Sequence, residues 1–199
     1  MLSCSGCMSI FTSELPPPGA ELDYDSYYSE SNLSVPAFIE QRAAEIVAEF
    51  SPYKKCGRML DIGFGAGTLL EAGQKAGWQP FGLEVSLPAV EQARSRGFET
   101  FHGSLEESAY PDSHFDVVMA SEILEHLPDP LADLREIARI IRPGGLFWAT
   151  TPSARGISYR FMKMGWSILS PPEHTQIYSA KGVERLFGGA GFSQVRIRT

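Results

Sequence analysis

The sequence predicts an α/β fold, in which a mostly parallel sheet carries helices on both faces. Two observations predict it. Short apolar runs typical of buried strands alternate with amphipathic stretches typical of helices between residues 59 and 151. Strands that alternate with helices are joined by right-handed crossovers, which leave the strands parallel and both faces covered. A length of 199 residues suits one such domain with a full hydrophobic core.

The expected elements follow in chain order. The first helix begins near Ser34, which can cap it, and continues to Phe50. The strands of the sheet are expected at Met59–Ile62, Pro80–Val85, Glu99–His102, Phe115–Ala120 and Leu146–Thr151. The helices between them are expected at Thr68–Ala76, Pro88–Ser95 and Pro130–Ile141. The last unit is a helix, its closing glycine and a strand, at Ala180–Ala190, Gly191 and Phe192–Ile197.

Residues 1–33 differ from the rest of the chain in composition. They are rich in Pro, Ser, Tyr and acidic residues, and the run Pro16–Gly19 interrupts any helix or strand. We therefore expect an extended N-terminal arm over residues 1–33, followed by one domain over residues 34–199.

Composition and charge exclude several classes of protein. Hydrophobic residues make up 43% and charged residues 21%, which is ordinary globular usage. The formal net charge is −7, and only residues 151–199, with seven basic and two acidic side chains, could offer nucleic acid a basic surface. No apolar run is long enough to cross a bilayer, and the first residues do not resemble a signal peptide. We expect a cytoplasmic protein that binds no nucleic acid.

The most informative stretch is Asp-Ile-Gly-Phe-Gly-Ala-Gly-Thr, residues 61–68, between the first expected strand of the sheet and the next helix. Its three glycines let the chain turn tightly and let the backbone approach a ligand closely. A dinucleotide-binding loop has the pattern G-x-G-x-x-G/A, which requires Gly or Ala where this chain has Thr68 or Leu70. The pattern of a nicotinamide-dependent oxidoreductase therefore fails in both registers.

Glu84 stands at the end of the second expected strand, 23 residues after Asp61. A carboxylate at the carboxyl end of a parallel strand can accept hydrogen bonds from both hydroxyls of a ribose. A carboxylate that is merely solvated at a strand end is the alternative.

The loop and Glu84 resemble the first motifs of class I S-adenosylmethionine-dependent methyltransferases. Three further segments are similar to that family and occur in its order, at residues 115–130, 134–145 and 172–179. The resemblance covers about residues 58–197. It implies a Rossmann-like, doubly wound sheet from which the family's seventh strand is missing. It also implies S-adenosylmethionine as cofactor and S-adenosylhomocysteine as product.

The resemblance further implies which residues bind the cofactor. They are Asp61, Gly63, Phe64, Gly65, Gly67, Glu84, Val85, Ser104, Leu105, Ser121 and Glu122. Asp61 and the glycines would line the methionine moiety, Glu84 the ribose, and Ser104 the adenine. Family members often carry Asp at the position of Ser104. The last two residues would lie beside the sulfonium.

Methyl transfer needs few side chains, because the methyl group is already activated and the enzyme mainly aligns the acceptor and removes its proton. Glu122, Glu125 and His126 resemble the Glu-x-x-Glu-His motif of ubiquinone-pathway O-methyltransferases, whose residues bind a divalent ion. The alternative, which we favour, is that they shape the loop, and we expect no metal. His174 is a further candidate base, or else it pins its own loop. The catalytic candidates are therefore Glu122, His126 and His174.

Residues 154–178 are expected to form a lid-like insertion before the last helix. The part over residues 154–169 interleaves aromatic and methionine side chains with Arg155, Arg160 and Lys163. That pattern suits a lid over an apolar acceptor or peripheral contact with a membrane surface, and packing against the domain is the alternative.

The chain has three cysteines, Cys4, Cys7 and Cys56, which cannot form a disulfide framework. The first two form a C-x-x-C pair that, with the residues as far as Tyr28, looks like a remnant of the zinc ribbon that precedes some methyltransferases. A structural zinc site needs four ligands, and the sequence offers no second C-x-x-C pair or nearby histidine. We therefore expect no zinc.

The sequence thus predicts an enzyme that transfers a methyl group from S-adenosylmethionine to a small-molecule acceptor, with O-methylation favoured. A non-catalytic protein that binds S-adenosylmethionine or S-adenosylhomocysteine is the first alternative, ahead of a nicotinamide-dependent oxidoreductase. The sequence predicts neither the acceptor nor the oligomeric state.

Overall fold

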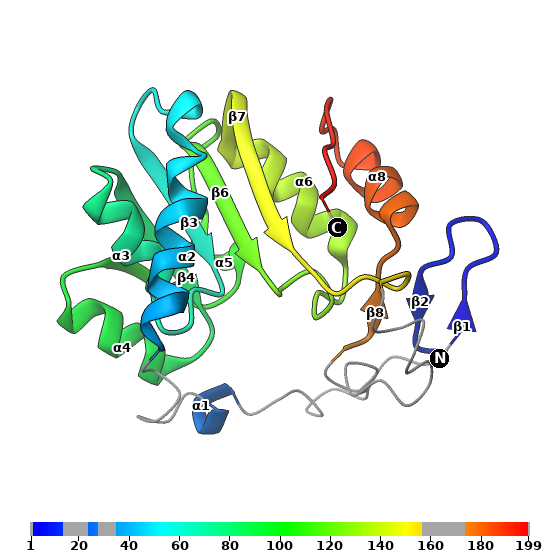
Figure 1. The fold of residues 1–199 in the computed structure, drawn as a ribbon, viewed down its shortest axis with the longest axis horizontal. Coiled ribbons are helices and arrows are strands. Elements are labelled where there is room, and N and C mark those ends of the chain that lie inside the picture. The colour runs from blue at the N-terminus through cyan, green and yellow to red at the C-terminus, as the bar shows by residue number, and fades with distance from the viewer. Residues whose placement is uncertain (1, 14–23, 28–34, 157–173, 199) are drawn as a thin grey trace. The chain divides into compact units, whose positions relative to one another are not determined.

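The computed structural model (Figure 1) describes four stretches of the chain, residues 2–13, 24–27, 35–156 and 174–198. The chain divides into two compact units. The sheet unit comprises residues 23–121 and 136–149. The hairpin unit comprises residues 1–22, 122–135 and 150–199.

The sheet unit is built on five strands in the order β5-β4-β3-β6-β7. They are β3 (Arg58–Ile62), β4 (Gln79–Glu84), β5 (Glu99–His102), β6 (Phe115–Ser121) and β7 (Ile141–Thr150). β3 pairs in parallel with both β4 and β6, and β4 pairs in parallel with β5. The α/β prediction is thereby confirmed. The strand order reverses at β3, and ligands of such sheets bind at the carboxyl ends beside that point.

Helices lie on both sides of this sheet in Figure 1. They are α2 (Ala37–Ala48), η1 (Ser51–Tyr53), α3 (Thr68–Lys75), α4 (Leu87–Ser95), α5 (Leu105–Ser108) and α6 (Pro130–Ile140), with a single turn, α1 (Tyr24–Tyr27), earlier in the chain. The longer ones match the predicted helices to within a few residues, whereas the short α1 and α5 are not among them. The expected cap Ser34 lies outside the described residues, and Pro36 occupies the N-cap of α2.

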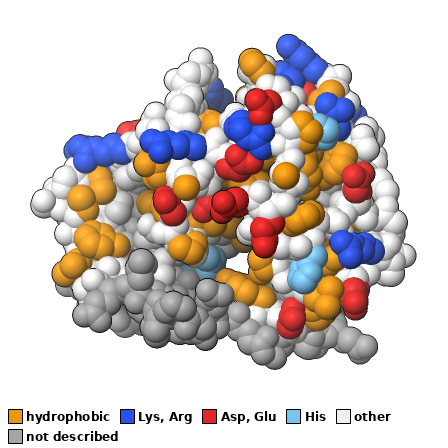
Figure 2. All heavy atoms as spheres, turned by 180° about the vertical axis from the view of Figure 1, so that it is seen from behind, with side chains coloured by type: hydrophobic (Ala, Val, Ile, Leu, Met, Phe, Trp, Pro, Cys, Tyr) orange, Lys and Arg blue, Asp and Glu red, His pale blue; other side chains and the backbone are white. Residues whose placement is uncertain are grey.

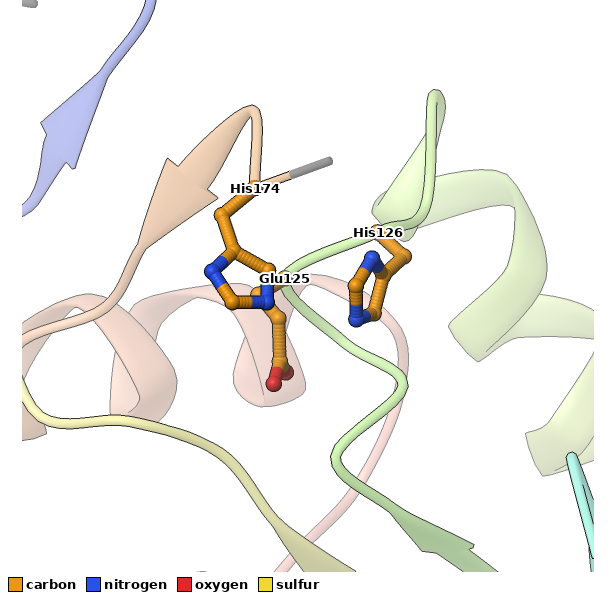
Figure 3. A group of neighbouring side chains, drawn as sticks. All are labelled: Glu125, His126 and His174. Carbon is orange, nitrogen blue, oxygen red and sulfur yellow. The ribbon is translucent and has the colours of Figure 1, made fainter. Parts of the chain in front are cut away.

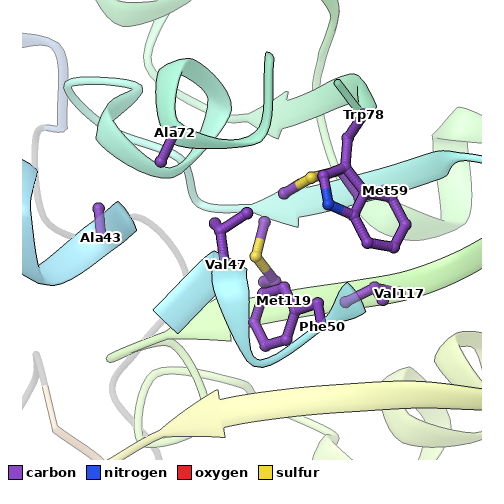
Figure 4. Packing of buried hydrophobic residues seen from close by; sticks show 8 residues of the cluster. All are labelled: Ala43, Val47, Phe50, Met59, Ala72, Trp78, Val117 and Met119. Atoms are coloured by element: carbon purple, nitrogen blue, oxygen red, sulfur yellow. The ribbon is translucent and has the colours of Figure 1, made fainter. Parts of the chain in front are cut away.

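The main core packs α2 and α3 against one face of the sheet (Figure 4). Met59 of β3 and Met119 of β6 are fully buried there beside Val47 of α2. Gly73 of α3 permits this close approach, because a β-carbon at that position would lie 2.5 Å from Met59 Sδ. Burial of each such side chain stabilises the fold by roughly 1.5–3 kcal/mol. This cluster fixes the two strands that flank the expected binding edge.

Asp116, near the start of β6, joins three segments of the chain. Its buried carboxylate accepts hydrogen bonds from the backbone N–H groups of Lys55 at 2.8 Å and Gly57 at 2.6 Å, and from Arg142 Nε. Burial alone would raise the pKa of Asp116, but these hydrogen bonds outweigh burial and lower the pKa to about 2. The ionised carboxylate therefore ties β6 to the start of β7 and to the segment before β3.

The hairpin unit contains a small antiparallel sheet in the order β1-β2-β8, formed by β1 (Leu2–Ser3), β2 (Ile10–Phe11) and β8 (Gln176–Ile177). The sequence predicts no strand in residues 1–33, so β1 and β2 correct that expectation. They form because Ile10 pairs with Ile177, near the other end of the chain, and no local pattern reveals such a contact. The run Pro16–Gly19 lies outside the described residues.

The predicted last helix is confirmed as α8 (Ala180–Gly189), which is N-capped by the Ser179 side chain. The predicted strand over Phe192–Ile197 is wrong, because the structure describes these residues and assigns them no strand. The N–H of Phe192 donates to the carbonyl of Phe187 at 3.1 Å and so completes the end of the helix instead. In the described part of the chain, the residues that follow have no pairing strand.

Figure 2 shows how the charged side chains are distributed over one face of the surface. Basic side chains on the face in Figure 2 have acidic and hydrophobic neighbours rather than forming one basic area. Within the described ranges, no helix is long and apolar enough to span a bilayer. A groove between α2 and α3, which Ala44 and Ala72 help to line, contains none of the predicted site residues.

Candidate functional site

The glycine loop, residues 63–67, connects β3 to α3. Its three glycines have φ angles of +68°, +50° and +74°, in the left-handed region that other residues avoid. The N–H of Gly63 donates to a carbonyl of β4 at 2.7 Å, which fixes the start of the loop. The ring of Phe64 turns into the core, where a β-carbon at Gly82 would collide with it. The loop therefore presents backbone, not side chains, at the edge of the sheet.

Glu84, the last residue of β4, is bonded to this loop. Its Oε2 accepts a hydrogen bond from the N–H of Gly65 at 3.0 Å, and its Oε1 accepts from the N–H groups of Val85 at 2.8 Å and Ser86 at 3.1 Å. The carboxylate is 3% exposed. The predicted ribose-binding residue is thus held against the glycine loop by hydrogen bonds on two sides.

Asp61 lies on β3 immediately before the loop and is 2% exposed. Burial, and next the negative charge of Glu84, raise the pKa of Asp61 well above its ordinary value. Neither carboxylate forms an ion pair with a basic side chain of the described residues. A ligand that brings a positive charge between them would relieve this repulsion, whereas an anionic pyrophosphate would increase it.

The neighbouring strand ends complete this edge. Gly103, which follows β5, donates its N–H to the carbonyl of Glu84 at 3.0 Å. Ser104 then caps α5, and its hydroxyl donates to Glu107 Oε2 at 2.9 Å. Leu105 is buried. Because the cap occupies the hydroxyl of Ser104, the position offers a ligand less than the family's usual Asp would.

β6 ends at Ser121, next to β3, with Ala120 paired to Ile62. The following residue, Glu122, is exposed and has φ +55°, which is rare for a residue with a side chain. Its N–H donates to the carbonyl of Thr150 at 3.0 Å. The structure therefore brings the predicted residues from Asp61 to Ser121 to one edge of the sheet unit, while Glu122 belongs to the hairpin unit.

Arg96, just after α4, is a residue that the sequence analysis missed. Its Nη1 donates to the carbonyl of Ala66 in the glycine loop at 2.9 Å, and its Nη2 forms an ion pair with Glu71 of α3. Arg96 thereby links the glycine loop to α3. An arginine at the end of a helix is a common surface residue, so no signal in the sequence marks it.

In the hairpin unit, Glu125, His126 and His174 lie together, and we call them the histidine cluster (Figure 3). Their ligand atoms all lie within 4.8 Å of one another, and the two imidazole rings are 4.7 Å apart between centroids. Glu122, the third predicted catalytic residue, is not part of this group. Two imidazoles and a carboxyl in such proximity can exchange protons or hold a cation.

Hydrogen bonds between two distant segments assemble the cluster. The N–H of Thr175 donates to the carbonyl of Glu125 at 3.2 Å, and Gln176 Nε2 donates to the carbonyl of Leu127 at 2.7 Å. The Tyr178 hydroxyl donates to the carbonyl of Leu124 at 3.4 Å. These contacts hold His174 beside the loop that follows β6.

Glu125 supplies the carboxyl of the cluster. It is 1% exposed and accepts a hydrogen bond from Thr151 Oγ1 at 2.8 Å. Burial raises its pKa to about 7, despite opposing hydrogen bonds from the backbone and Thr151 and the charge of His174. A carboxyl that titrates near neutral pH can share a proton with an adjacent imidazole.

Most of the predicted lid, residues 157–173, lies outside the described residues, and so does most of the segment suggested for membrane contact. The described ends of the insertion are close together. The N–H of Ala154 donates to the carbonyl of Tyr178 at 2.8 Å, and Ser153 forms a parallel bridge with Tyr178.

A parallel sheet with an Asp-x-Gly-x-Gly-x-Gly loop after its first strand and an acid at the end of its second is the arrangement of class I S-adenosylmethionine-dependent methyltransferases. A model of the methyltransferase domain family matches residues 36–197, and the chain belongs to this family. S-adenosylmethionine is the cofactor of the class. The buried acidic pair of Asp61 and Glu84 fits a ligand that carries a sulfonium and an ammonium group.

Curated relatives agree with this placement, and solved structures share the fold. The ubiquinone biosynthesis O-methyltransferase of Vibrio cholerae is 35% identical over 115 residues, which are 54% of this chain and 47% of that protein. The chain thus spans about half the length of the curated relatives it matches. An S-adenosylmethionine-dependent methyltransferase from Archaeoglobus fulgidus superposes with a TM-score of 0.68 at 21% identity, covering 87% of this chain and 76% of that one. PigF with S-adenosylhomocysteine gives 0.61 at 25% identity, covering 81% and 53%.

Proposed function

We propose that this chain transfers the methyl group of S-adenosylmethionine to a hydroxyl of a small molecule in the cytoplasm. The observation that carries the proposal is the glycine loop bonded to Glu84 beside buried Asp61. The similarity to O-methyltransferases supports oxygen as the acceptor atom. We further propose that residues 34–199 are the methyltransferase domain, with residues 154–178 as a lid.

The cofactor would be held by the edge of the sheet unit. Asp61 would face the ammonium of the methionine moiety, and the backbone of the glycine loop, Phe64 included, would line its chain. Glu84 and Val85 would contact the ribose, with Ser104 and Leu105 along the adenine. Ser121 and Glu122 would lie towards the sulfonium.

The bound cofactor supplies an electrophilic methyl group. The chain must then orient the acceptor and remove the proton of its hydroxyl, which we assign to His174. The adjacent Glu125 carboxyl stabilises the imidazolium that forms, and His126 limits how the ring can turn. The exposed carboxylate of Glu122 would help to orient the acceptor.

A ligand-binding experiment tests the cofactor. S-adenosylhomocysteine should raise the melting temperature of the chain because it binds the folded state only, and NAD should not. Stabilisation by NAD alone would overturn the assignment. Transfer of labelled methyl to a panel of phenols and other small hydroxyl compounds tests the activity. Binding of S-adenosylhomocysteine without transfer to any compound would favour the non-catalytic alternative.

Chelation tests the role of the histidine cluster. We propose a reaction without metal, so activity should survive EDTA. The proximity of three donor groups favours the rival reading, in which a divalent cation activates the acceptor. Loss of activity with EDTA that magnesium or zinc restores, and that Glu125→Gln abolishes, would establish this rival.

A further inference from the structure

The glycine loop needs contacts from outside itself to keep one arrangement. Three of its five residues, 63–67, are glycines, which adopt positive and negative φ about equally well. A peptide group next to a glycine can therefore turn over without a steric penalty, and its N–H and C=O then exchange directions. Because this loop would bind the cofactor through its backbone, each such turn changes the groups that the cofactor meets.

The peptide group between Ala66 and Gly67, in the second half of the loop, is held at both ends. Its N–H donates to the carbonyl of Phe64 at 2.8 Å. Its carbonyl accepts a hydrogen bond from Arg96 Nη1 at 2.9 Å. The N–H and C=O of a trans peptide point in opposite directions, so turning this group over would break both hydrogen bonds. The first contact lies within the loop, and the second comes from outside it.

Arg96 is itself fixed by its neighbours. Its Nη2 forms an ion pair with Glu71 in the first turn of α3, and its Cζ lies over the ring of Phe98, 5.3 Å from the centroid. The backbone N–H of Arg96 donates to the carbonyl of Ala93 at the end of α4. The side chain is only 29% exposed, so water screens these contacts less than on an open surface. A planar guanidinium can bond the loop and Glu71 at the same time.

We propose that Arg96 is a positioning residue that sets the affinity for the cofactor by holding the peptide between Ala66 and Gly67 in the binding arrangement. The inference rests on the proposed binding of the cofactor at the glycine loop. The apparent dissociation constant rises as the populated fraction of the binding arrangement falls. If the loop keeps that arrangement for about one tenth of the time without Arg96, the affinity falls about tenfold.

Calorimetry of S-adenosylhomocysteine binding to Arg96→Ala tests the proposal, with Arg94→Ala as the matched control. Arg94 lies two residues earlier, and its hydrogen bonds in the described residues go to the side chain and carbonyl of Thr100 in β5, both at 3.1 Å. Arg96→Ala should weaken binding about tenfold, whereas Arg94→Ala should leave the affinity unchanged. In turnover assays, Arg96→Ala should raise KM for S-adenosylmethionine and leave kcat unchanged, because His174 is intact.

Glu71→Gln tests whether the contacts act in series. This variant frees one side of the guanidinium but leaves the bond to the loop, so it should weaken binding by only roughly two- to threefold. Combining it with Arg96→Ala should add nothing to the loss from Arg96→Ala, because Glu71 acts through Arg96. An additive loss would contradict the proposed series of contacts.

Glu84→Ala, measured in parallel, separates this inference from the placement of the cofactor. If Glu84→Ala weakens binding and Arg96→Ala does not, the placement stands and the role of Arg96 is wrong. If neither variant weakens binding, the placement fails and the inference fails with it. A lower melting temperature of Arg96→Ala at unchanged affinity would show a purely structural role. Arg96→Lys keeps the charge but not the fork, so it should also weaken binding and serves if Arg96→Ala does not fold.

Discussion

The glycine loop with Glu84 and the histidine cluster are assembled in different ways. The first lies within residues 61–86 and is held by backbone hydrogen bonds between paired strands and one carboxylate. The second joins residues 125–126 to His174, 48 residues later, through contacts that arise only in the folded chain. A site built mainly of backbone groups can therefore be predicted from a sequence motif, whereas a site built of side chains from distant segments depends on tertiary contacts.

Replacing His174 should have the largest effect and should separate the two regions most clearly. Without its general base, His174→Gln should lower kcat by roughly 10²–10⁴-fold. The affinity for S-adenosylhomocysteine should not change, because the glycine loop is intact. Turnover assays and calorimetry measure the two quantities, and His114→Gln, just before β6, is the matched control. If affinity falls in proportion to kcat, cofactor binding and proton removal are not separated between the two regions as proposed.

Glu125 should make the stability of the fold depend on pH. Its folded-state pKa of about 7 lies above that of an unfolded Glu, so the folded state binds the proton more tightly. The stability it contributes is complete below about pH 4.5 and is lost as pH rises through about 7, by roughly 3 kcal/mol. Urea unfolding at several pH values measures the effect. Glu125→Gln should flatten this part of the profile, and identical profiles for the two proteins would contradict the burial argument.

Glu84→Ala should act on the other region. It should weaken the binding of S-adenosylhomocysteine by roughly 1–3 kcal/mol, because it removes charged acceptors from the ribose hydroxyls. The variant also releases the N–H groups of Gly65 and Ser86, so some loss of thermal stability should accompany it. Titration calorimetry beside the exposed control Glu91→Ala checks the prediction. Equal affinities for the two variants would remove Glu84 from the cofactor site.

Thr151→Val should have the smallest effect and tests how strongly the Thr151 hydrogen bond affects the pKa of Glu125. The variant removes the hydrogen bond to Glu125 Oε2, at a cost of about 1 kcal/mol. Because that hydrogen bond lowers the pKa of Glu125, the pH profile of activity should move to higher pH. The affinity for S-adenosylhomocysteine should stay as in the wild type. A profile that does not move would mean that Glu125 does not control the reaction.

The sequence predicted the elements whose signals are local. The strand over 59–62 and the helix after the glycine loop follow from apolar runs and glycine positions that the structure confirms. β2 was not predicted because its partner Ile177 is distant in the chain. The strand predicted over Phe192–Ile197 is the opposite case, since an alternating pattern forms no strand when no partner strand pairs with it. The proximity of Glu125 and His174 could not be predicted for the same reason.

Because Asp116 is paired with a basic side chain, the unpaired buried negative charge of the sheet unit lies at only one end of its strands. At the amino ends of the strands its charge is matched inside the fold by Arg142, so little field leaves that end. At the carboxyl ends, the buried charge of Glu84 lacks such a basic match in the described part of the chain. The unbalanced end attracts cations from a distance, which raises the encounter rate of a positively charged ligand and makes that rate fall as salt is added.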